Sequence, residues 1–367
     1  MIKQVLVFIF SLIMYTTAFS QPLPFISNGK YGYIDCETND IVVPPRFLNA
    51  GEFSEGFAVV QEFPEGGFNG QVRYGFINEK GDLQIPFQFE NAQRFKRGFA
   101  RVKQAGAWGM INTEGKMVVP AQYDDLWAFR EERALAWNDG YFGFISPTNE
   151  IIAPFIYTGG GHFHDGRARV KKNGRWGFIG LDGEIAIDCW YDKVDDFSDF
   201  LAGVKDNSRW GFVDTDGKVV IDCKYEKING FNEGFAAVRD RRNWGFIDKN
   251  GNKVIDCKYK DVKDFNEGLA PVKIKGSWGY IDKNDKLVIS NIYQNAFRFQ
   301  AGLAKIKIAG KYGCINKDGL VVVKPEYNEI MRMDDEKTFL VCKNGFLSKR
   351  YDYINYNGEV IAKNIYR

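Results

Sequence analysis

The sequence repeats every 34 residues, and this period constrains the fold more than any other feature. An aromatic residue followed by glycine recurs at equal spacing, with the glycines at Gly75, Gly109, Gly143, Gly177, Gly211, Gly245, Gly279 and Gly313. The first and last of these lie 238 residues apart, which is seven steps of 34 without a slip. Tyr31-Gly32 and Tyr351-Asp352 extend the array at its two ends, the former after a nine-residue expansion. The chain therefore holds about ten units, and such an array needs no separate core for each domain.

Each unit has the residue pattern of short β-strands. After the aromatic-glycine strand comes a turn that carries glycine in six units, as in Asp216-Gly217, and Asn149 or Asp285 in two others. An Asp-Gly pair between apolar runs is a strong hairpin signal. A second strand ends on an aromatic residue such as Tyr225, and a third follows, as at 234–238. Helical repeats of this length need apolar residues three and four positions apart, which these units lack.

We therefore predict an all-β fold, a tandem array of about ten three-stranded antiparallel units of ~34 residues. Closed β-propellers usually have about four to eight blades. Because ten units exceed that number, the sequence favours an open, curved, superhelical array. A β-propeller-like ring is the alternative.

The unit resembles a known repeat. The segment WGFIDKNGNKVIDCKYKDVKDFNEGLAPVKIKGS, residues 244–277, is similar to the WG repeat, also called the KWG repeat, of bacterial β-repeat proteins. The resemblance covers roughly residues 28–365, and the departures are Phe142 for Trp, Cys314 for Phe and Asp352 for Gly. Atypical outer units are expected of caps. The resemblance implies a repeat scaffold and indicates no substrate.

The N-terminus has the pattern of a secretory signal peptide. Lys3 precedes an apolar stretch from Val5 to Tyr15, and Ala18-Phe19-Ser20 is a small-x-small cleavage site. We expect residues 1–20 to be removed and residues 21–367 to form the repeat array of an exported protein, periplasmic, cell-surface or secreted. No later segment reaches roughly eighteen uninterrupted apolar residues, so we expect no integral membrane segment after cleavage.

The tryptophan column is predicted to be structural, with one large ring wedged between neighbouring sheets in each unit. Its members are Trp108, Trp176, Trp210, Trp244 and Trp278. Tyr or Phe replaces Trp in other units while the surrounding residues stay apolar, which is typical of a packing position. Exposed rings that stack on sugars are the alternative.

The six cysteines of an exported chain would ordinarily indicate disulfides. Cys189, Cys223 and Cys257 share one column, in which other units have Phe or Ala. Free Cys behaves as a small apolar residue at such a position, so we expect unpaired buried thiols. Cys36, Cys314 and Cys342 belong to other columns and remain unassigned.

Composition and motifs indicate no cofactor, metal or catalytic residue. The 49 basic and 47 acidic side chains nearly balance, which disfavours a nucleic-acid binder. His162 and His164 would share one face of a strand and could bind a metal with Asp165. Their columns are polar in the other units, however, and no third strong ligand has suitable spacing. The sequence therefore predicts a polar surface there.

The favoured function is a non-catalytic scaffold that binds an unidentified protein or glycan at the bacterial envelope. An envelope hydrolase that uses two carboxylates on the array surface is the alternative. Carboxylates such as Asp195, Asp196 and Asp199 are abundant, but no pair stands out as catalytic from a solvated rim. We expect a partner to contact the chain where the register is broken. One such place is 62–72, with Phe68 as an aromatic anchor, and the other is 158–166, a pliable loop that carries His162 and His164.

Overall fold

The computed structural model describes residues 21–365, apart from 36, 39, 64–69, 334–337 and 344–349. All regular elements in this part of the chain are β-strands. Three features of interest lie outside the described residues: the expected signal peptide at 1–20, Cys36 and Phe68. The expected anchor role of Phe68 therefore stays a prediction.

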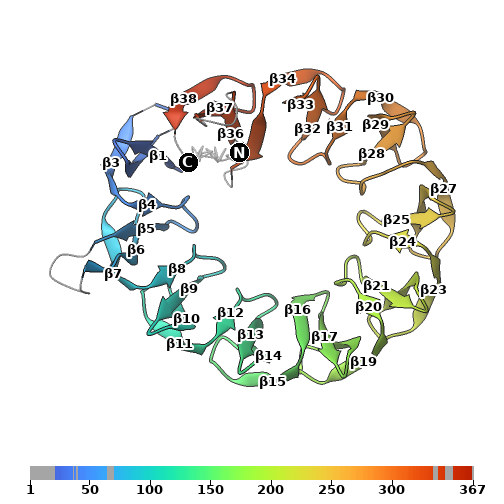
Figure 1. Ribbon diagram of the computed structural model, residues 1–367, viewed down its shortest axis with the longest axis horizontal. Helices are drawn as coiled ribbons and strands as arrows, with labels where there is room; N and C mark the ends of the chain where they lie inside the picture. The colour runs from blue at the N-terminus through green and yellow to red at the C-terminus, as the bar shows by residue number, and fades with distance from the viewer. Residues whose placement is uncertain are drawn as a thin grey trace, which may run out of the picture.

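Ten antiparallel sheets follow one another around a closed ring with an open centre (Figure 1). Each sheet is one continuous stretch of chain, and we number these sheets as blades 1 to 10. Blades 1 and 8 have three strands, and the other eight blades have four. In the four-stranded blades the first strand lies nearest the centre and the last strand forms the perimeter (Figure 1).

The strands of the first five blades have the following bounds. Blade 1 comprises β1 (Leu23–Ser27), β2 (Lys30–Ile34) and β3 (Ile41–Phe47). Blade 2 comprises β4 (Asn49–Ala50), β5 (Ala58–Glu62), β6 (Arg73–Ile77) and β7 (Leu83–Phe89). Blade 3 comprises β8 (Asn91–Ala92), β9 (Phe99–Gln104), β10 (Ala107–Asn112) and β11 (Met117–Tyr123). Blade 4 comprises β12 (Asp125–Leu126), β13 (Ala134–Asn138), β14 (Tyr141–Ile145) and β15 (Ile151–Tyr157). Blade 5 comprises β16 (Gly159–His164), β17 (Arg167–Lys172), β18 (Arg175–Ile179) and β19 (Ile185–Tyr191).

The remaining five blades repeat the same order. Blade 6 comprises β20 (Lys193–Val194), β21 (Leu201–Asp206), β22 (Arg209–Asp214) and β23 (Val219–Tyr225). Blade 7 comprises β24 (Lys227–Ile228), β25 (Phe235–Asp240), β26 (Asn243–Asp248) and β27 (Lys253–Tyr259). Blade 8 comprises β28 (Leu269–Ile274), β29 (Ser277–Asp282) and β30 (Leu287–Tyr293). Blade 9 comprises β31 (Asn295–Ala296), β32 (Leu303–Ile308), β33 (Lys311–Asn316) and β34 (Val321–Tyr327). Blade 10 comprises β35 (Glu329–Arg332), β36 (Thr338–Cys342), β37 (Tyr351–Asn355) and β38 (Val360–Ile365).

The all-β array of ten units is confirmed, and the chain forms the ring that the sequence left as the alternative. The open array that the sequence favoured is not formed, because the two terminal blades present apolar faces to each other. Leu23 of blade 1 packs with Tyr351 and Tyr353 of blade 10 in one buried cluster. The Tyr353 hydroxyl also donates a hydrogen bond to the Pro24 carbonyl at 2.9 Å. An open array would instead need polar caps at both ends.

The sequence predicted three strands in each unit, and the short inner strand is the one it missed. This strand has only two residues in six blades, too few to show alternation. In blade 8 it is reduced to an isolated bridge between Val262 and Val272.

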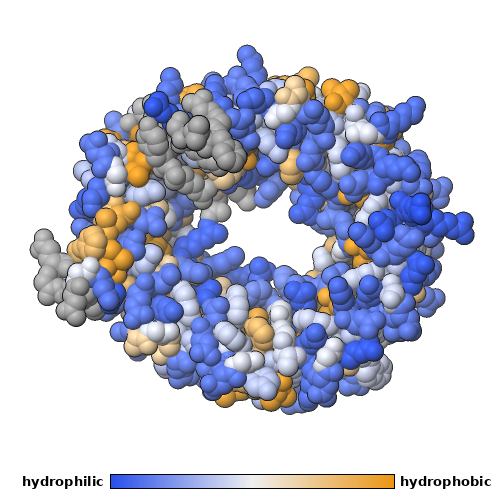
Figure 2. Space-filling view, viewed as in Figure 1, coloured by the Kyte–Doolittle hydropathy of each residue, from blue (hydrophilic) through white to orange (hydrophobic). Residues whose placement is uncertain are grey.

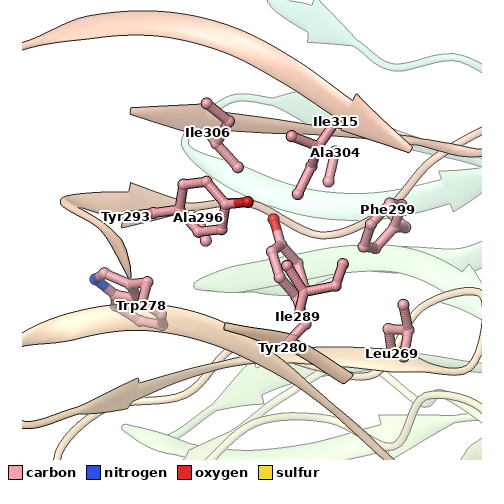
Figure 3. Close-up of a cluster of buried hydrophobic side chains, with 10 residues drawn as sticks. All are labelled: Leu269, Trp278, Tyr280, Ile289, Tyr293, Ala296, Phe299, Ala304, Ile306 and Ile315. Atoms are coloured by element: carbon pink, nitrogen blue, oxygen red, sulfur yellow. The ribbon is translucent and has the colours of Figure 1, made fainter. Parts of the chain in front are cut away.

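The hydrophobic core lies between the blades. Ten clusters of buried side chains each join residues of two adjacent blades, so every blade boundary is a packed interface. Figure 3 shows the boundary of blades 8 and 9, where Tyr280 and Phe299 meet at 5.0 Å between ring centroids. The same pair recurs as Phe178 with Phe197 and as Phe212 with Phe231, both at 4.8 Å. Aromatic pairs at this distance add to the stability that burial alone provides.

The tryptophan column contributes less to this core than the sequence predicted. Trp278 is buried, whereas Trp108, Trp176, Trp210 and Trp244 are half-buried. Most of these rings pack at the edge of a cluster between blades. The residue two positions later, such as Phe212 or Phe246, is the one that is fully buried.

The glycine after each tryptophan is required by close backbone approach. A Cβ at Gly211 would lie 2.3 Å from the Ile221 carbonyl oxygen, and one at Gly245 would lie 2.4 Å from that of Ile255. The strand pairing shifts register at this point in both blades. The glycine therefore lets the outermost strand cross close to the third strand at a bulge.

Candidate functional site: a basic cavity at blades 3 to 5

The carboxylates that recur in register hold neighbouring blades together. Glu233 accepts hydrogen bonds from the backbone amides of Glu267 and Gly268 in the next blade. Glu267 in turn accepts from the Gly302 amide, and Asp199 accepts from the Gly234 amide. Each carboxylate stands in a tight turn with positive φ, between the inner strand and the second strand. These groups are therefore structural links around the ring.

Asp195 and Asp196 are consecutive carboxylates of blade 6. Burial raises the pKa of Asp195, while nearby Arg169 lowers it. Asp196 forms an ion pair with Arg169, with 3.0 Å between Oδ1 and Nε. The pair stands at the inner edge of blade 6, and one member is already bound to a cation.

The GGGHFHDG segment is a strand, and the sequence expectation of a pliable loop is wrong. β16 covers six residues and is the longest inner strand of the ring. Its three glycines leave room for large neighbouring side chains. A Cβ at Gly159 would meet Trp176, and one at Gly160 would meet Leu135. A Cβ at Gly161 would lie 2.5 Å from Arg169 Nε. These glycines allow dense packing.

The two histidines have separate surroundings. Phe163, between them, is buried against Phe144 of blade 4, at 5.3 Å between centroids. His162 lines a cavity on the inner side of blades 3 to 5, and the lining of that cavity does not include His164. Burial lowers the pKa of His162, and the positive charge of Arg130 lowers it further. His162 is therefore neutral at neutral pH.

We name this space cavity A. Its volume is about 260 Å³, and its lining comprises Gln93, Arg94, Lys96, Arg101, Trp127, Ala128, Phe129, Arg130 and His162. Four of these residues carry a full positive charge and none is acidic. The tryptophan and Phe129 add aromatic surface. The cavity therefore combines a positive potential with a ring wall.

The Arg101 side chain at cavity A contacts two tryptophan rings and one carboxylate. Its guanidinium lies over the Trp108 ring at 4.6 Å and over the Trp127 ring at 5.9 Å, and it forms an ion pair with Asp125. Burial lowers the pKa of Arg101, and Asp125 acts in the opposite direction. Its Nε is buried without a partner among the described residues. Arg101 is therefore a fixed cation with an unused donor.

Cavity A lies where the aromatic pair between blades is missing. Met110 takes the fully buried position that Phe or Tyr fills in most blades, and Phe129 pairs with Phe99 instead, at 4.9 Å. We did not identify Met110, Arg101 or Trp127 from the sequence. Alignment of the residues that directly follow each aromatic-glycine pair would have marked Met110 as an exception.

Two further cavities occupy equivalent places in the ring. One of about 480 Å³ lies between blades 2 and 3 and is lined mainly by uncharged residues, with Glu52 and Arg94 of opposite charge. Another of about 200 Å³ lies between blades 9 and 10. Hydrophilic residues border much of the central opening in the face shown in Figure 2.

The structure also bears on metal, membrane and disulfide chemistry. Within the described residues, no three His, Cys, Asp or Glu side chains are placed to hold a metal ion. No helix in that part of the chain has the length and apolar character to cross a bilayer. Cys189, Cys223, Cys257 and Cys314 are free thiols, which confirms the expectation of unpaired cysteines for the column at 189, 223 and 257.

Comparison with known proteins agrees with this architecture. No curated protein sequence matches the chain. Among solved structures, one described as a crystal structure of the eukaryotic initiation factor is similar over 80% of this chain and 93% of that one, at 12% identity and a TM-score of 0.55. A structure of Kluyveromyces lactis Hsv2p matches 73% of this chain and 93% of its own, at 8% identity and a TM-score of 0.34. At such identities the first similarity concerns the fold alone.

The residue pattern of the WG containing repeat matches nine segments of the chain. They are residues 31–62, 74–106, 108–141, 142–176, 176–210, 210–241, 244–277, 278–312 and 312–345. Together they span most of the ring, and each segment such as 74–106 runs from the outer two strands of one blade into the inner strands of the next. The chain therefore belongs to the WG containing repeat family.

Proposed function

We propose that the mature chain is an exported, non-catalytic scaffold that binds acidic glycans at the bacterial envelope, with cavity A as its binding site. The lining of cavity A carries the proposal: it includes four cations and the Trp127 indole, and none of the lining residues is acidic. Export is inferred from the pattern of residues 1–20.

The chemistry of cavity A suits a sugar that carries an anionic group. Arg and Lys side chains bind carboxylate and sulfate groups through charge-assisted hydrogen bonds. An indole face offers apolar surface to the flat side of a sugar ring. The cavity is smaller than the roughly 300–1,000 Å³ of sites for drug-sized ligands, so it suits one sugar unit of a longer chain.

A non-catalytic role is favoured over a hydrolase because these carboxylates are already engaged in hydrogen bonds and an ion pair. Asp199, Glu233 and Glu267 are hydrogen-bonded to backbone amides of the next blade, and Asp196 is paired with Arg169. Glycoside hydrolysis needs two carboxylates that face the same bond. A scaffold function requires none.

The proposal is tested by measuring binding of polygalacturonate, neutral dextran and poly-glutamate to residues 21–367 by calorimetry. We expect polygalacturonate to bind, dextran not to bind, and the Lys96→Gln/Arg130→Gln double variant to bind at least about tenfold more weakly. The matched control is Lys193→Gln/Lys227→Gln, which removes the same charge from exposed positions in blades 6 and 7. This control should retain the affinity at constant salt.

Three results would overturn the glycan assignment. Poly-glutamate binding as tightly as polygalacturonate, with no loss in Trp127→Ala, would indicate an acidic protein partner. Equal loss in the control variant would indicate non-specific charge attraction. Release of reducing ends from polygalacturonate would indicate an enzyme.

A further inference from the structure

The boundary between blades 9 and 10 lacks both rings of the aromatic pair. The residue two positions after the repeated aromatic residue is large in every other blade, where it is Tyr33, Phe76, Met110, Phe144, Phe178, Phe212, Phe246, Tyr280 or Tyr353. Blade 9 has Cys314 at this position, fully buried. Met333 stands where the partner ring would be, and it packs into the cluster between blades 10 and 1. A ring-sized space is therefore left beside Cys314.

This space is the cavity of about 200 Å³ between blades 9 and 10, which we name cavity B. It is lined by Phe297, Arg298, Gln300, Leu303, Lys305, Cys314, Ile330, Arg332 and Phe339. Figure 3 shows the neighbouring boundary, where Tyr280 and Phe299 fill the equivalent position. The contrast between the two boundaries shows what a small side chain at position 314 leaves open.

Two cations converge on cavity B. Lys305 Nζ lies 3.3 Å from the Ile330 carbonyl oxygen and 4.5 Å from the Phe297 ring centre. Arg332 donates through Nη2 to the Gln300 carbonyl, and its Nη1 is buried without a partner among the described residues. Arg298, a third cation in the lining, forms an ion pair with Asp264, with 3.1 Å between Nη1 and Oδ2.

The surroundings of Cys314 show that both cations lie near the empty ring position. Burial raises the pKa of the Cys314 thiol to about 12, while the positive charges of Arg332 and Lys305 act against that rise. The thiol is therefore neutral and unreactive at physiological pH, and it supplies an apolar floor. None of the residues that line the cavity is acidic.

We propose that cavity B binds a small carboxylate that carries one aromatic ring. The ring occupies the space beside Cys314, between Phe297 and Phe339, and the carboxylate lies against Lys305 and Arg332. The volume of cavity B is below the roughly 300–1,000 Å³ of drug-sized sites, which limits the ligand to about one ring. Charge-assisted hydrogen bonds would fix the anionic end. This site is independent of the proposed function of cavity A.

The test is calorimetric titration of residues 21–367 with benzoate, with benzyl alcohol as the neutral analogue. We expect one saturable site for benzoate and at least about tenfold weaker binding of benzyl alcohol. Cys314→Phe should abolish benzoate binding, because the new ring would fill cavity B. Phe212 and Phe246 fill the equivalent positions in blades 6 and 7. Lys305→Gln should weaken binding by about tenfold or more.

Controls separate cavity B from cavity A and from unfolding. Cys314→Phe should unfold thermally at or above the temperature of the parent chain, since Phe is the usual residue in that column. If Cys314→Phe unfolds at a lower temperature than the parent chain, benzoate binding to the Lys305→Gln variant decides the test. Lys96→Gln/Arg130→Gln should leave benzoate binding unchanged. No benzoate binding, binding retained in a folded Cys314→Phe chain, or loss in the cavity A variant would each overturn the proposal.

Discussion

Phe246 of blade 7 and Phe265 of blade 8 meet across the blade boundary with 4.8 Å between their ring centroids. Both rings are almost fully buried, and they lie 19 residues apart in the sequence. This contact joins consecutive blades and recurs around the ring. It places the main stabilising ring of each unit two residues after the tryptophan.

Replacing Phe246 should therefore destabilise the ring more than replacing Trp244. We expect Phe246→Ala to cost about 3–5 kcal/mol of unfolding free energy and Trp244→Ala clearly less, because the latter ring is only half-buried. Urea unfolding followed by circular dichroism measures both. Trp190, which is 69% exposed, provides the control, and Trp190→Ala should change stability by no more than about 0.5 kcal/mol. An equal loss for Trp244→Ala and Phe246→Ala would contradict this ranking.

Ring closure should make blade 1 as important to stability as any other blade. Leu23 is 2% exposed in the cluster that joins blades 10 and 1, so Leu23→Ala should cost about 2–5 kcal/mol. In an open array, blade 1 would have one neighbour and the loss would be smaller. The measurement is the urea midpoint, with Leu320→Ala, at a 64% exposed position, as control. A Leu23→Ala effect no larger than that of the control would argue against closure in solution.

The links between blades should weaken in acid. Burial acts to raise the pKa of Glu233, but hydrogen bonds from the Gly268 and Glu267 amides and from Lys283 outweigh it, so the pKa is lowered overall. A lowered folded-state pKa stabilises the ring above the ordinary glutamate value of about 4.3. That contribution is lost as the pH falls through the folded-state pKa.

Glu233→Gln should therefore reduce the difference in melting temperature between pH 7 and pH 3. Glu150→Gln, at an exposed turn position, is the control and should leave that difference unchanged. Identical acid sensitivity of the parent chain and Glu233→Gln would show that this link does not contribute.

The thiols of Cys189, Cys223 and Cys257 should be free but slow to react. Burial raises the pKa of each of them, and each Sγ lies 3.7–3.9 Å from a valine carbonyl oxygen on its own blade. Ellman's reagent at pH 8 should react slowly with the native chain and at once with at least four thiols in guanidinium. A disulfide among these three residues in the non-reduced peptide map would contradict the expectation.

The local features of the fold were predictable because they rest on short-range rules. The 34-residue period, the hairpin turns such as Asp216-Gly217 and the close approach at Gly211 all follow from neighbouring residues. The replacement of turn glycines by Asn149 and Asp285 is explained by contacts with the preceding blade, which are not local. Tyr123 and Tyr259 of the preceding blades donate hydrogen bonds to these two side chains, at 2.8 and 2.5 Å.

Closure and the cavities depend on contacts that the period does not encode. Whether ten units close depends on the packing angle summed over all boundaries and on the apolar faces around Leu23 and Tyr353. Cavity A is lined by residues of three blades, from Gln93 to His162, and cavity B lies beside one departure within a column, at Cys314. The Cys314 departure was visible in the sequence, but its effect appears only when the missing ring is set against its partner in the next blade.

Among the strands of residues 21–365 that the structure describes, none pairs blade 1 with blade 10 in one sheet. Each blade is one uninterrupted segment, and blades 10 and 1 meet through side chains. A gene duplication or loss of one 34-residue segment therefore adds or removes a whole blade and breaks no strand pairing. The circumference of the ring, and with it the width of the central aperture, can change in steps of one repeat while the chemistry of each boundary is inherited intact.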